Sequence, residues 1–284
     1  MIIRKLSKKS DFFVFFAVFR VLFLNLLKLV LVRECGLMEL VLKNADVFKK
    51  SMEAIAVLID EAELVVSSTG LELKATDPSQ ISMVDFAMPK SAFSKFDSAD
   101  TRLGLDLDYL NQVLSRASSG DELVLSIDEK KAFLTVTFNG NAKRAFQVPL
   151  IDISSSEVPN PRIEFDAELI VSASFLQSAF KDAALISSHV VMGCSEDTFF
   201  VKANSSKGNL NEDIKNNKVT LPEIRVKREC KSMFPLDYLQ DMLKAASSDS
   251  KVNLYLKSNA PVRVSYLIGE ASINYFLAPR IESQ

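Results

Sequence analysis

The 284-residue chain has no tryptophan, eight glycines, three cysteines and a single histidine. The cysteines are widely spaced and form no C-x-x-C pair, which is poor material for a disulfide framework or a zinc site and is typical of a reducing compartment. The few glycines form no phosphate-binding loop, and neither a G-x-S-x-G nor an H-E-x-x-H motif is present. We therefore expect no enzymatic activity, no metal site and no cofactor.

Two groups of residues offer an alternative, catalytic interpretation. Cys194 and His189 are close enough in sequence to form a thiol–imidazole pair, as in a hydrolase. If Val190–Cys194 is a strand, however, Cys194 is more simply a buried strand residue and His189 a turn residue. Asp106 and Asp108 could act as paired carboxylates, but the simpler role for Asp108 is the N-cap of the helix that follows.

The N-terminal segment is strongly apolar and basic. Residues 12–31 hold six of the twenty phenylalanines but are interrupted by Arg20, Asn25 and Lys28, which disfavours a transmembrane helix. No A-x-A cleavage site of a signal peptide follows. We expect residues 1–37 to be a non-native or unstructured hydrophobic extension, with the native start at Met38. The remaining chain has 27 basic and 34 acidic residues, a net charge of −7, so it is an acidic protein.

The strongest signal is an internal repeat at about half the chain length. Leu107-Asp108-Tyr109-Leu110 reappears as Leu236-Asp237-Tyr238-Leu239, and Leu73-Lys74-Ala75 as Val201-Lys202-Ala203. The pattern Phe146-x-x-Pro149-x-Ile151 similarly reappears as Phe276-x-x-Pro279-x-Ile281. These copies lie 129, 128 and 130 residues apart. So long a period indicates two copies of a whole domain.

Each copy alternates short strands with two helices. Asn44-Ala45-Asp46 suits a helix N-cap, and Phe48, Met52, Ile55 and Ile59 follow at helical spacing. The other helices are expected at Tyr109–Ala117, Phe175–Ile186 and Tyr238–Ala246. Strands are expected at Glu39–Leu42, Leu64–Ser67, Leu71–Ala75, Ile81–Ala87, Leu103–Leu107, Glu122–Ile127, Ala132–Phe138, Lys143–Leu150, Val190–Cys194, Thr198–Ala203, Lys218–Leu221, Ile224–Arg228, Val252–Leu256, Val262–Leu267 and Ser272–Leu277.

This pattern predicts an α+β fold of two tandem domains with antiparallel sheets. The N-terminal domain is expected at 38–151 and the C-terminal domain at 166–284. Residues 152–165, which include three serines and two prolines without periodicity, are the connecting linker.

The helices also carry cations opposite their apolar stripes. A set of exposed Lys and Arg residues on duplicated helices could line one surface and attract a phosphate backbone without reading its sequence. Glu53, Asp182 and Asp241 dilute this signal. The candidate set is Lys49, Lys50, Arg116, Lys181 and Lys244.

Together, these motifs and the ending Leu277-Ala278-Pro279-Arg280-Ile281-Glu282 resemble the proliferating cell nuclear antigen family of DNA sliding clamps, with most similarity to archaeal members. The resemblance covers about residues 38–282. It implies a ring of three subunits with helices lining the hole and sheets outside. Double-stranded DNA would thread the hole and contact the five cations named above, in a sequence-independent manner.

The resemblance also implies a groove for partner proteins with a short hydrophobic-aromatic motif, namely DNA polymerase, flap nuclease and ligase, and it implies a clamp loader. By position, the groove residues are Thr76, Ile81, Met83, Val158, Pro159, Pro261, Phe276, Ala278 and Pro279. Subunits would join where Lys143–Leu150 meets 209–215 of the next subunit, with Lys143 and Arg144 near Glu212 and Asp213.

The resulting functional prediction is a non-enzymatic polymerase processivity factor, without a membrane partner. It would be cytoplasmic and nucleoid-associated in an archaeon, and nuclear in a eukaryote. One alternative is a clamp-like subunit that assembles only with paralogues in a hetero-oligomeric ring. Another is a scaffold tethered to a membrane by residues 12–31.

Overall fold

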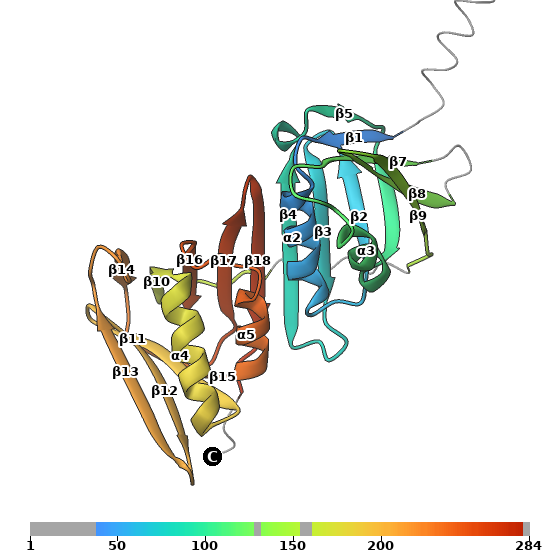
Figure 1. The fold of residues 1–284 in the computed structure, drawn as a ribbon. Helices are drawn as coiled ribbons and strands as arrows, with labels where there is room; N and C mark the ends of the chain where they lie inside the picture. Colours follow the sequence, from blue (N-terminus) through green and yellow to red (C-terminus); the bar gives the residue numbers. More distant parts are fainter. Residues whose placement is uncertain (1–37, 128–131, 154–160, 281–284) are drawn as a thin grey trace, which may run out of the picture. The chain divides into compact units, whose positions relative to one another are not determined.

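The computed structural model describes residues 38–127, 132–153 and 161–280, and these form two repeats with the same order of elements (Figure 1). The first repeat contains β1 (Glu39–Leu42), α2 (Ala45–Ala56), β2 (Glu61–Ser67), β3 (Gly70–Thr76), β4 (Ser82–Pro89), the 3-10 helix η1 (Lys90–Ala92), β5 (Lys95–Asp97), β6 (Thr101–Asp106), α3 (Leu107–Leu114), β7 (Glu122–Ile127), β8 (Phe133–Asn139) and β9 (Lys143–Pro149). The second contains β10 (Ala167–Ser172), α4 (Ala173–Ile186), β11 (His189–Ser195), β12 (Thr198–Ser205), β13 (Gly208–Lys215), β14 (Glu223–Val226), β15 (Cys230–Pro235), α5 (Leu236–Leu243), β16 (Lys251–Leu256), β17 (Val262–Ile268) and β18 (Ala271–Leu277).

Strand pairing repeats as faithfully as strand order. The first repeat pairs β5-β1-β7-β8-β9 and the second pairs β14-β10-β16-β17-β18. Likewise, β4-β3-β2-β6 corresponds to β13-β12-β11-β15. The two repeats join where β18 pairs with β4, from Ser272 opposite Ala87 to Leu277 opposite Ser82. One sheet therefore runs through both halves, and the predicted α+β architecture of two tandem domains is confirmed.

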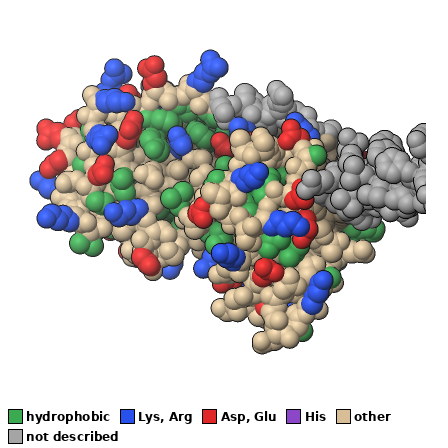
Figure 2. All heavy atoms as spheres, turned by 90° about the horizontal axis from the view of Figure 1, so that it is seen from above, with side chains coloured by type: hydrophobic (Ala, Val, Ile, Leu, Met, Phe, Trp, Pro, Cys, Tyr) green, Lys and Arg blue, Asp and Glu red, His purple; other side chains and the backbone are tan. Residues whose placement is uncertain are grey.

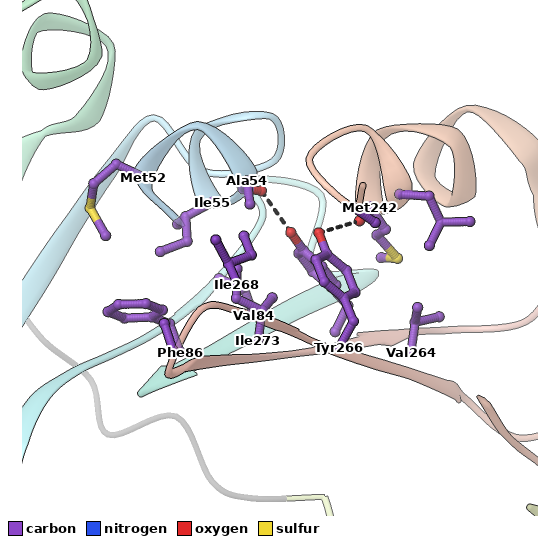
Figure 3. Close-up of a cluster of buried hydrophobic side chains, with 14 of the residues drawn as sticks. Met52, Ala54, Ile55, Val84, Phe86, Met242, Val264, Tyr266, Ile268 and Ile273 are labelled. Atoms are coloured by element: carbon purple, nitrogen blue, oxygen red, sulfur yellow. Dashed lines mark hydrogen bonds between the residues drawn. The ribbon is translucent and has the colours of Figure 1, made fainter. Parts of the chain in front are cut away.

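The helices form a layer against the sheets, in which α2 contacts α3 and α5, and α5 contacts α4. Two buried tyrosines tie this layer to the shared sheet (Figure 3). Tyr275 of β18 donates a 2.8 Å hydrogen bond to the Ala54 carbonyl in α2, and Tyr266 of β17 donates one of 2.8 Å to Met242 in α5. Each hydroxyl satisfies a carbonyl near a helix C-terminus that the helix cannot satisfy itself.

The helix starts agree only partly with the sequence. Asn44 is the N-cap of α2, as predicted, and accepts a hydrogen bond from the Asp46 amide. The cap predicted for the next helix was wrong, because α3 begins at Leu107 and Asp106 is the residue whose carboxylate accepts from Tyr109 N, at 2.9 Å. Asp108 lies within the first turn. The equivalent helix α5 has Pro235 at this position and no side-chain cap.

Some strand predictions also need correction. The expected strand Lys218–Leu221 is a turn, in which the Asn217 side chain accepts from the amides of Val219 and Thr220. His189, expected in a turn, is the first residue of β11. The strands β5, β10, β13 and β15 were not among the expected strands. The predicted turn at 128–131 lies outside the described residues.

The structure also shifts one part of the repeat by a residue. In the first repeat, Leu125 is paired with Val136 on the next strand, and Val136 with Phe146 on the strand after that. In the second repeat, the corresponding partners are Leu254, Val264 and Tyr275. Tyr275, rather than Phe276, is thus the structural equivalent of Phe146. Because neighbouring strand residues point to opposite faces, Phe276 lies on the face away from the helices.

Candidate functional site

The loop between β3 and β4 is fixed by one buried carboxylate. Asp77 accepts hydrogen bonds from Ser82 N at 2.6 Å, Ser82 Oγ at 3.0 Å and Ser79 N at 3.0 Å. A further bond of 3.1 Å comes from the hydroxyl of Tyr238, in α5 of the second repeat. Burial opposes the charge on Asp77, but the bonds from Ser82, Tyr238 and Ser79 outweigh it and hold the pKa of Asp77 below its usual value. The loop therefore has a fixed position against the second repeat.

This loop completes a row of residues predicted as the partner groove. Met83 lies opposite Thr76 on one side and Phe276 on the other, so the three share one face of the joined sheet. The Ala278 amide donates a 2.8 Å hydrogen bond to the Ile81 carbonyl, which places the chain after β18 beside the loop. Met83 is buried, whereas Phe276 is half-buried. Pro261, Ala278 and Pro279 are also half-buried, and Val158 and Pro159 lie outside the described residues.

The start of the interdomain linker is held against β6. The Ile151 amide donates a 3.0 Å hydrogen bond to the Gly104 carbonyl. A Cβ atom on Gly104 would lie 2.0 Å from the Ile151 carbonyl oxygen, so only glycine permits this close approach. The linker therefore leaves the first repeat along a defined path.

The helix cations belong to the helix layer and are open to solvent. Lys50, Lys181 and Lys244 are exposed, and so is Arg116, just beyond the end of α3; Lys49 is half-buried. All five cations predicted from the sequence thus lie on the described helices or within two residues of a helix end. The acidic residues Glu53, Asp182 and Asp241 lie on the same helices. The face of the molecule seen in Figure 2 likewise shows Lys and Arg mixed with Asp and Glu.

Two strand edges carry the charges predicted for subunit contacts. Among the described strands, β9 and β13 each end a sheet with one edge unpaired. Arg144 of β9 bonds within its own repeat, to the Asp121 carboxylate and, at 2.7 Å, to the Arg116 carbonyl. On β13, Glu212 faces α4 and its Oε2 atom is buried without a hydrogen-bond partner in the described structure. Burial, and then the nearby Asp182, raise the pKa of Glu212.

The catalytic alternative fails on geometry. Cys194 is 1% exposed and points into the core, as predicted for a strand residue. His189 lies five positions earlier on β11, which places it on the opposite face, beside Ser188 and Arg280. The neighbouring Cys230 thiol and burial raise the pKa of Cys194, which favours the unreactive thiol.

The structure also contains contacts that the sequence did not suggest. The Tyr238–Asp77 bond and a cluster of Arg263, Tyr255 and Phe276 both join residues far apart in the chain. For the Arg263 cluster, the sequence offers only one signal, namely aromatic and basic residues that fall on the same face of neighbouring strands. Within the described ranges, no set of three or more His, Cys, Asp or Glu side chains could hold a metal ion. No helix in the same ranges is long and apolar enough to span a membrane.

Comparison with known proteins gives consistent matches along the chain. The family model for the proliferating cell nuclear antigen N-terminal domain matches residues 37–157, and that for the C-terminal domain matches 159–281. A DNA polymerase sliding clamp of Methanococcus vannielii is 35% identical over 246 residues, which cover 84% of this chain and 98% of that protein. The DNA polymerase sliding clamp of Pyrococcus furiosus is 32% identical over 246 residues, with 86% and 98% covered.

Solved structures show the same similarity. PCNA from Thermococcus kodakaraensis superposes with a TM-score of 0.82 at 26% identity, over 86% of this chain and 100% of that one. A. fulgidus PCNA, solved with the C-terminal region of FEN-1 bound, gives a TM-score of 0.78 at 28% identity, over 87% of this chain and 100% of that one.

Proposed function

The chain belongs to the proliferating cell nuclear antigen family, and we propose that it is a non-enzymatic DNA sliding clamp that tethers a polymerase and other DNA enzymes to duplex DNA. The repeated architecture carries this proposal, because it presents unpaired edges through which copies of the chain can close a ring. A closed ring stays on a long duplex by encirclement, so weak, sequence-independent contacts are sufficient and sliding remains easy.

The junction inside the chain is the template for the junction between chains. Within one chain, β18 of the second five-stranded set pairs with β4 of the first four-stranded set. The equivalents of these two strands are β9 and β13, each of which has one edge unpaired among the described strands. The same pairing between neighbouring chains would cover both edges and continue the sheet around a ring.

This template also supplies the register. Lys74 and Lys202 are equivalent in the two repeats, and they pair with Asp85 and Asn211 respectively. The next two residues along each strand are therefore also equivalent: Glu212 corresponds to Phe86, and Asp213 corresponds to Ala87. The equivalence of Phe146 and Tyr275 puts Arg144 and Lys143 in the places of Ile273 and Ser272.

Within the chain, Ile273 pairs with Phe86 and Ser272 with Ala87. Arg144 of one subunit would therefore oppose Glu212 of the next, and Lys143 would oppose Asp213. Both pairs join opposite charges, and the first brings a cation to the Glu212 carboxylate, whose Oε2 atom has no hydrogen-bond partner among the described residues.

The helix layer supports the DNA-binding part of the proposal. Exposed cations on α2, α4 and at the ends of α3 and α5 would contact phosphates without reading bases. The row formed by Thr76, Met83 and Phe276 supports the partner groove, because it places a half-buried aromatic ring beside a buried methionine on one face of the joined sheet. The relative from A. fulgidus binds the C-terminal region of FEN-1, and we propose flap nuclease, polymerase and ligase as partners of this chain.

A charge swap tests ring closure. We expect the solution mass of the full chain to be three times its 31.6 kDa. Lys143→Asp alone and Asp213→Lys alone should each weaken assembly, by about tenfold per interface, because a pair of opposite charges becomes a pair of like charges. The double variant should restore assembly. Lys251→Asp, on the outer face of β16, is the matched control and should leave the mass unchanged.

A monomer at micromolar concentration would contradict a homomeric ring. If the double variant did not assemble again, the proposed strand register would be contradicted. The solution mass of the parent chain would still test the ring.

A further inference from the structure

A cavity of about 760 Å³ lies on the face of β16, β17 and β18 that points away from the helices. Its lining includes three aromatic rings and four cations, contributed by Phe165, Tyr255, Phe276, Lys227, Arg228, Lys257 and Arg263. Val264 and Tyr275, which alternate with Arg263 and Phe276 along their strands, point into the core instead. The cavity is therefore a feature of the outer sheet surface.

Arg263 is held in a fixed orientation within this cavity. Its guanidinium carbon lies 4.9 Å from the centre of the Tyr255 ring and 5.8 Å from that of Phe276. Its Nε and Nη2 atoms donate to Asn274 Oδ1, at 3.2 and 2.6 Å. Asn274 Oδ1 also accepts from Ser265 Oγ at 2.8 Å, which fixes the amide. Rings and amide together prevent the long side chain from sampling other rotamers.

These contacts leave the end of the guanidinium available. Asn274 occupies the side edge formed by Nε and Nη2, so the N–H groups of Nη1 and the remaining one of Nη2 point away from it. This pair of parallel donors matches the two oxygens of a carboxylate, the geometry in which arginine binds acids most strongly. No carboxylate of the described residues forms an ion pair with Arg263.

The charges around the cavity favour an anion at this end. Four cations line it, Lys227, Arg228, Lys257 and Arg263, against three carboxylates, Glu164, Asp166 and Glu168. Lys227 and Glu168 pair with each other, with Lys227 Nζ 3.4 Å from Glu168 Oε1, which leaves three cations against two carboxylates. The aromatic walls lower the local dielectric and strengthen any ion pair formed against them.

The cavity is continuous with the partner groove through a shared residue. Phe276 lines the cavity beside Arg263 and also lies opposite Met83 in the groove. A peptide seated in the groove would extend its flanking residues over Arg263. We propose that Arg263 binds the carboxylate side chain of an Asp or Glu next to the hydrophobic-aromatic motif of partner proteins, and so selects among them. This inference rests on the proposed partner groove.

Calorimetric titration of the full chain with synthetic peptides tests the proposal. Each peptide carries a hydrophobic-aromatic motif with three-residue flanks, and one flank at a time contains either Glu or Gln. Both termini are blocked, so that a terminal carboxylate cannot substitute for the side chain. On one flank, we expect Glu to bind about tenfold more tightly than Gln, with a preference that decreases as salt increases.

Arg263→Gln should remove this preference while leaving the affinity for the Gln peptides unchanged. Arg225→Gln, a nearby exposed arginine on the same face, is the matched control and should keep the preference. An equal affinity for Glu and Gln on both flanks, or a preference that survives Arg263→Gln, would overturn the inference. Failure of every peptide to bind would instead contradict the partner groove itself.

Discussion

The hydroxyl of Tyr238 donates a 3.1 Å hydrogen bond to Asp77, and this bond connects α5 of the second repeat to the β3–β4 loop of the first across 161 residues of sequence. The same loop carries Ile81, whose carbonyl accepts from Ala278. The loop that borders the proposed partner groove is thus held by two hydrogen bonds from the second repeat, one from Tyr238 in α5 and one from Ala278 after β18. A disturbance of the Tyr238–Asp77 bond should therefore affect both stability and partner binding.

Removal of the Tyr238 hydroxyl tests this connection. Tyr238→Phe should lower the free energy of unfolding by about 1 kcal/mol, because the Asp77 carboxylate loses one charge-assisted hydrogen bond. Urea denaturation of the variant and the parent chain measures this difference. The matched control is Tyr109→Phe at the equivalent position of the first repeat, where the side chain is 41% exposed and should tolerate the change. Equal effects at both positions would contradict a specific role for Tyr238.

The pH dependence of stability provides a separate test of Asp77. The pKa of Asp77 is lower in the folded chain than the ~3.9 of an unfolded aspartate, so its ionised form stabilises the fold above that value. The parent chain should exceed Asp77→Asn in free energy of unfolding by a constant amount above about pH 5. This advantage should decrease as the pH falls below about 4 and Asp77 becomes protonated. A difference independent of pH would show that the charge of Asp77 contributes nothing.

The N-cap of α3 can be assigned by comparing two neighbouring aspartates. Asp106→Ala should cost about 1 kcal/mol of stability, because it leaves the Tyr109 amide without a partner. Asp108→Ala should cost less, since Asp108 contributes only a favourable charge in the first helical turn. Thermal unfolding of the two variants separates these effects, and a larger loss at Asp108 would restore the assignment made from the sequence.

The sequence predicted most of this fold because the two copies constrain each other. Repeated apolar spacing located the four α-helices of the described residues, and the strong hairpin strands such as Glu122–Ile127 were predicted at their observed limits. The cap was misplaced by two residues because both Asp106 and Asp108 suit a helix start, and only the backbone of Asp106 is extended. Strand β13 was not predicted because its alternation of Leu210, Glu212 and Ile214 includes a charged residue on the inner face.

The site was less predictable than the fold. Lys49, Lys50 and Lys181 could be named because each lies off the apolar stripe of its helix, which is a local pattern. Arg116 and Lys244 lie just beyond the ends of α3 and α5. The Tyr238–Asp77 bond and the orientation of Arg263 depend on strand order, which places residues of distant segments side by side. The incorrect match of Phe146 with Phe276 has the same origin. A shift of one residue barely changes the sequence pattern, yet it moves a side chain to the opposite face of the strand.

The cations of α2 should contribute to DNA binding but not to the fold. Lys49→Glu combined with Lys50→Glu should weaken retention on DNA and reduce its dependence on salt, because fewer counterions are released. Lys251→Glu combined with Arg225→Glu makes the same change in net charge on the outer face of the sheet and should have little effect. Assembly, measured by solution mass, should be unchanged in both. Loss of assembly in the first variant would place these lysines in the fold instead.

The central claim is that copies of this chain close around duplex DNA, and linearisation of a bound circle tests it most directly. The protein is assembled on a nicked circular plasmid, free protein is removed with high salt, and the plasmid is then cut once at a restriction site. We predict that the protein remains on the intact circle through the salt wash and is released within minutes of the cut, as the ring slides off the new ends. Loss from the uncut circle at the same rate, or retention unaffected by the cut, would contradict encirclement.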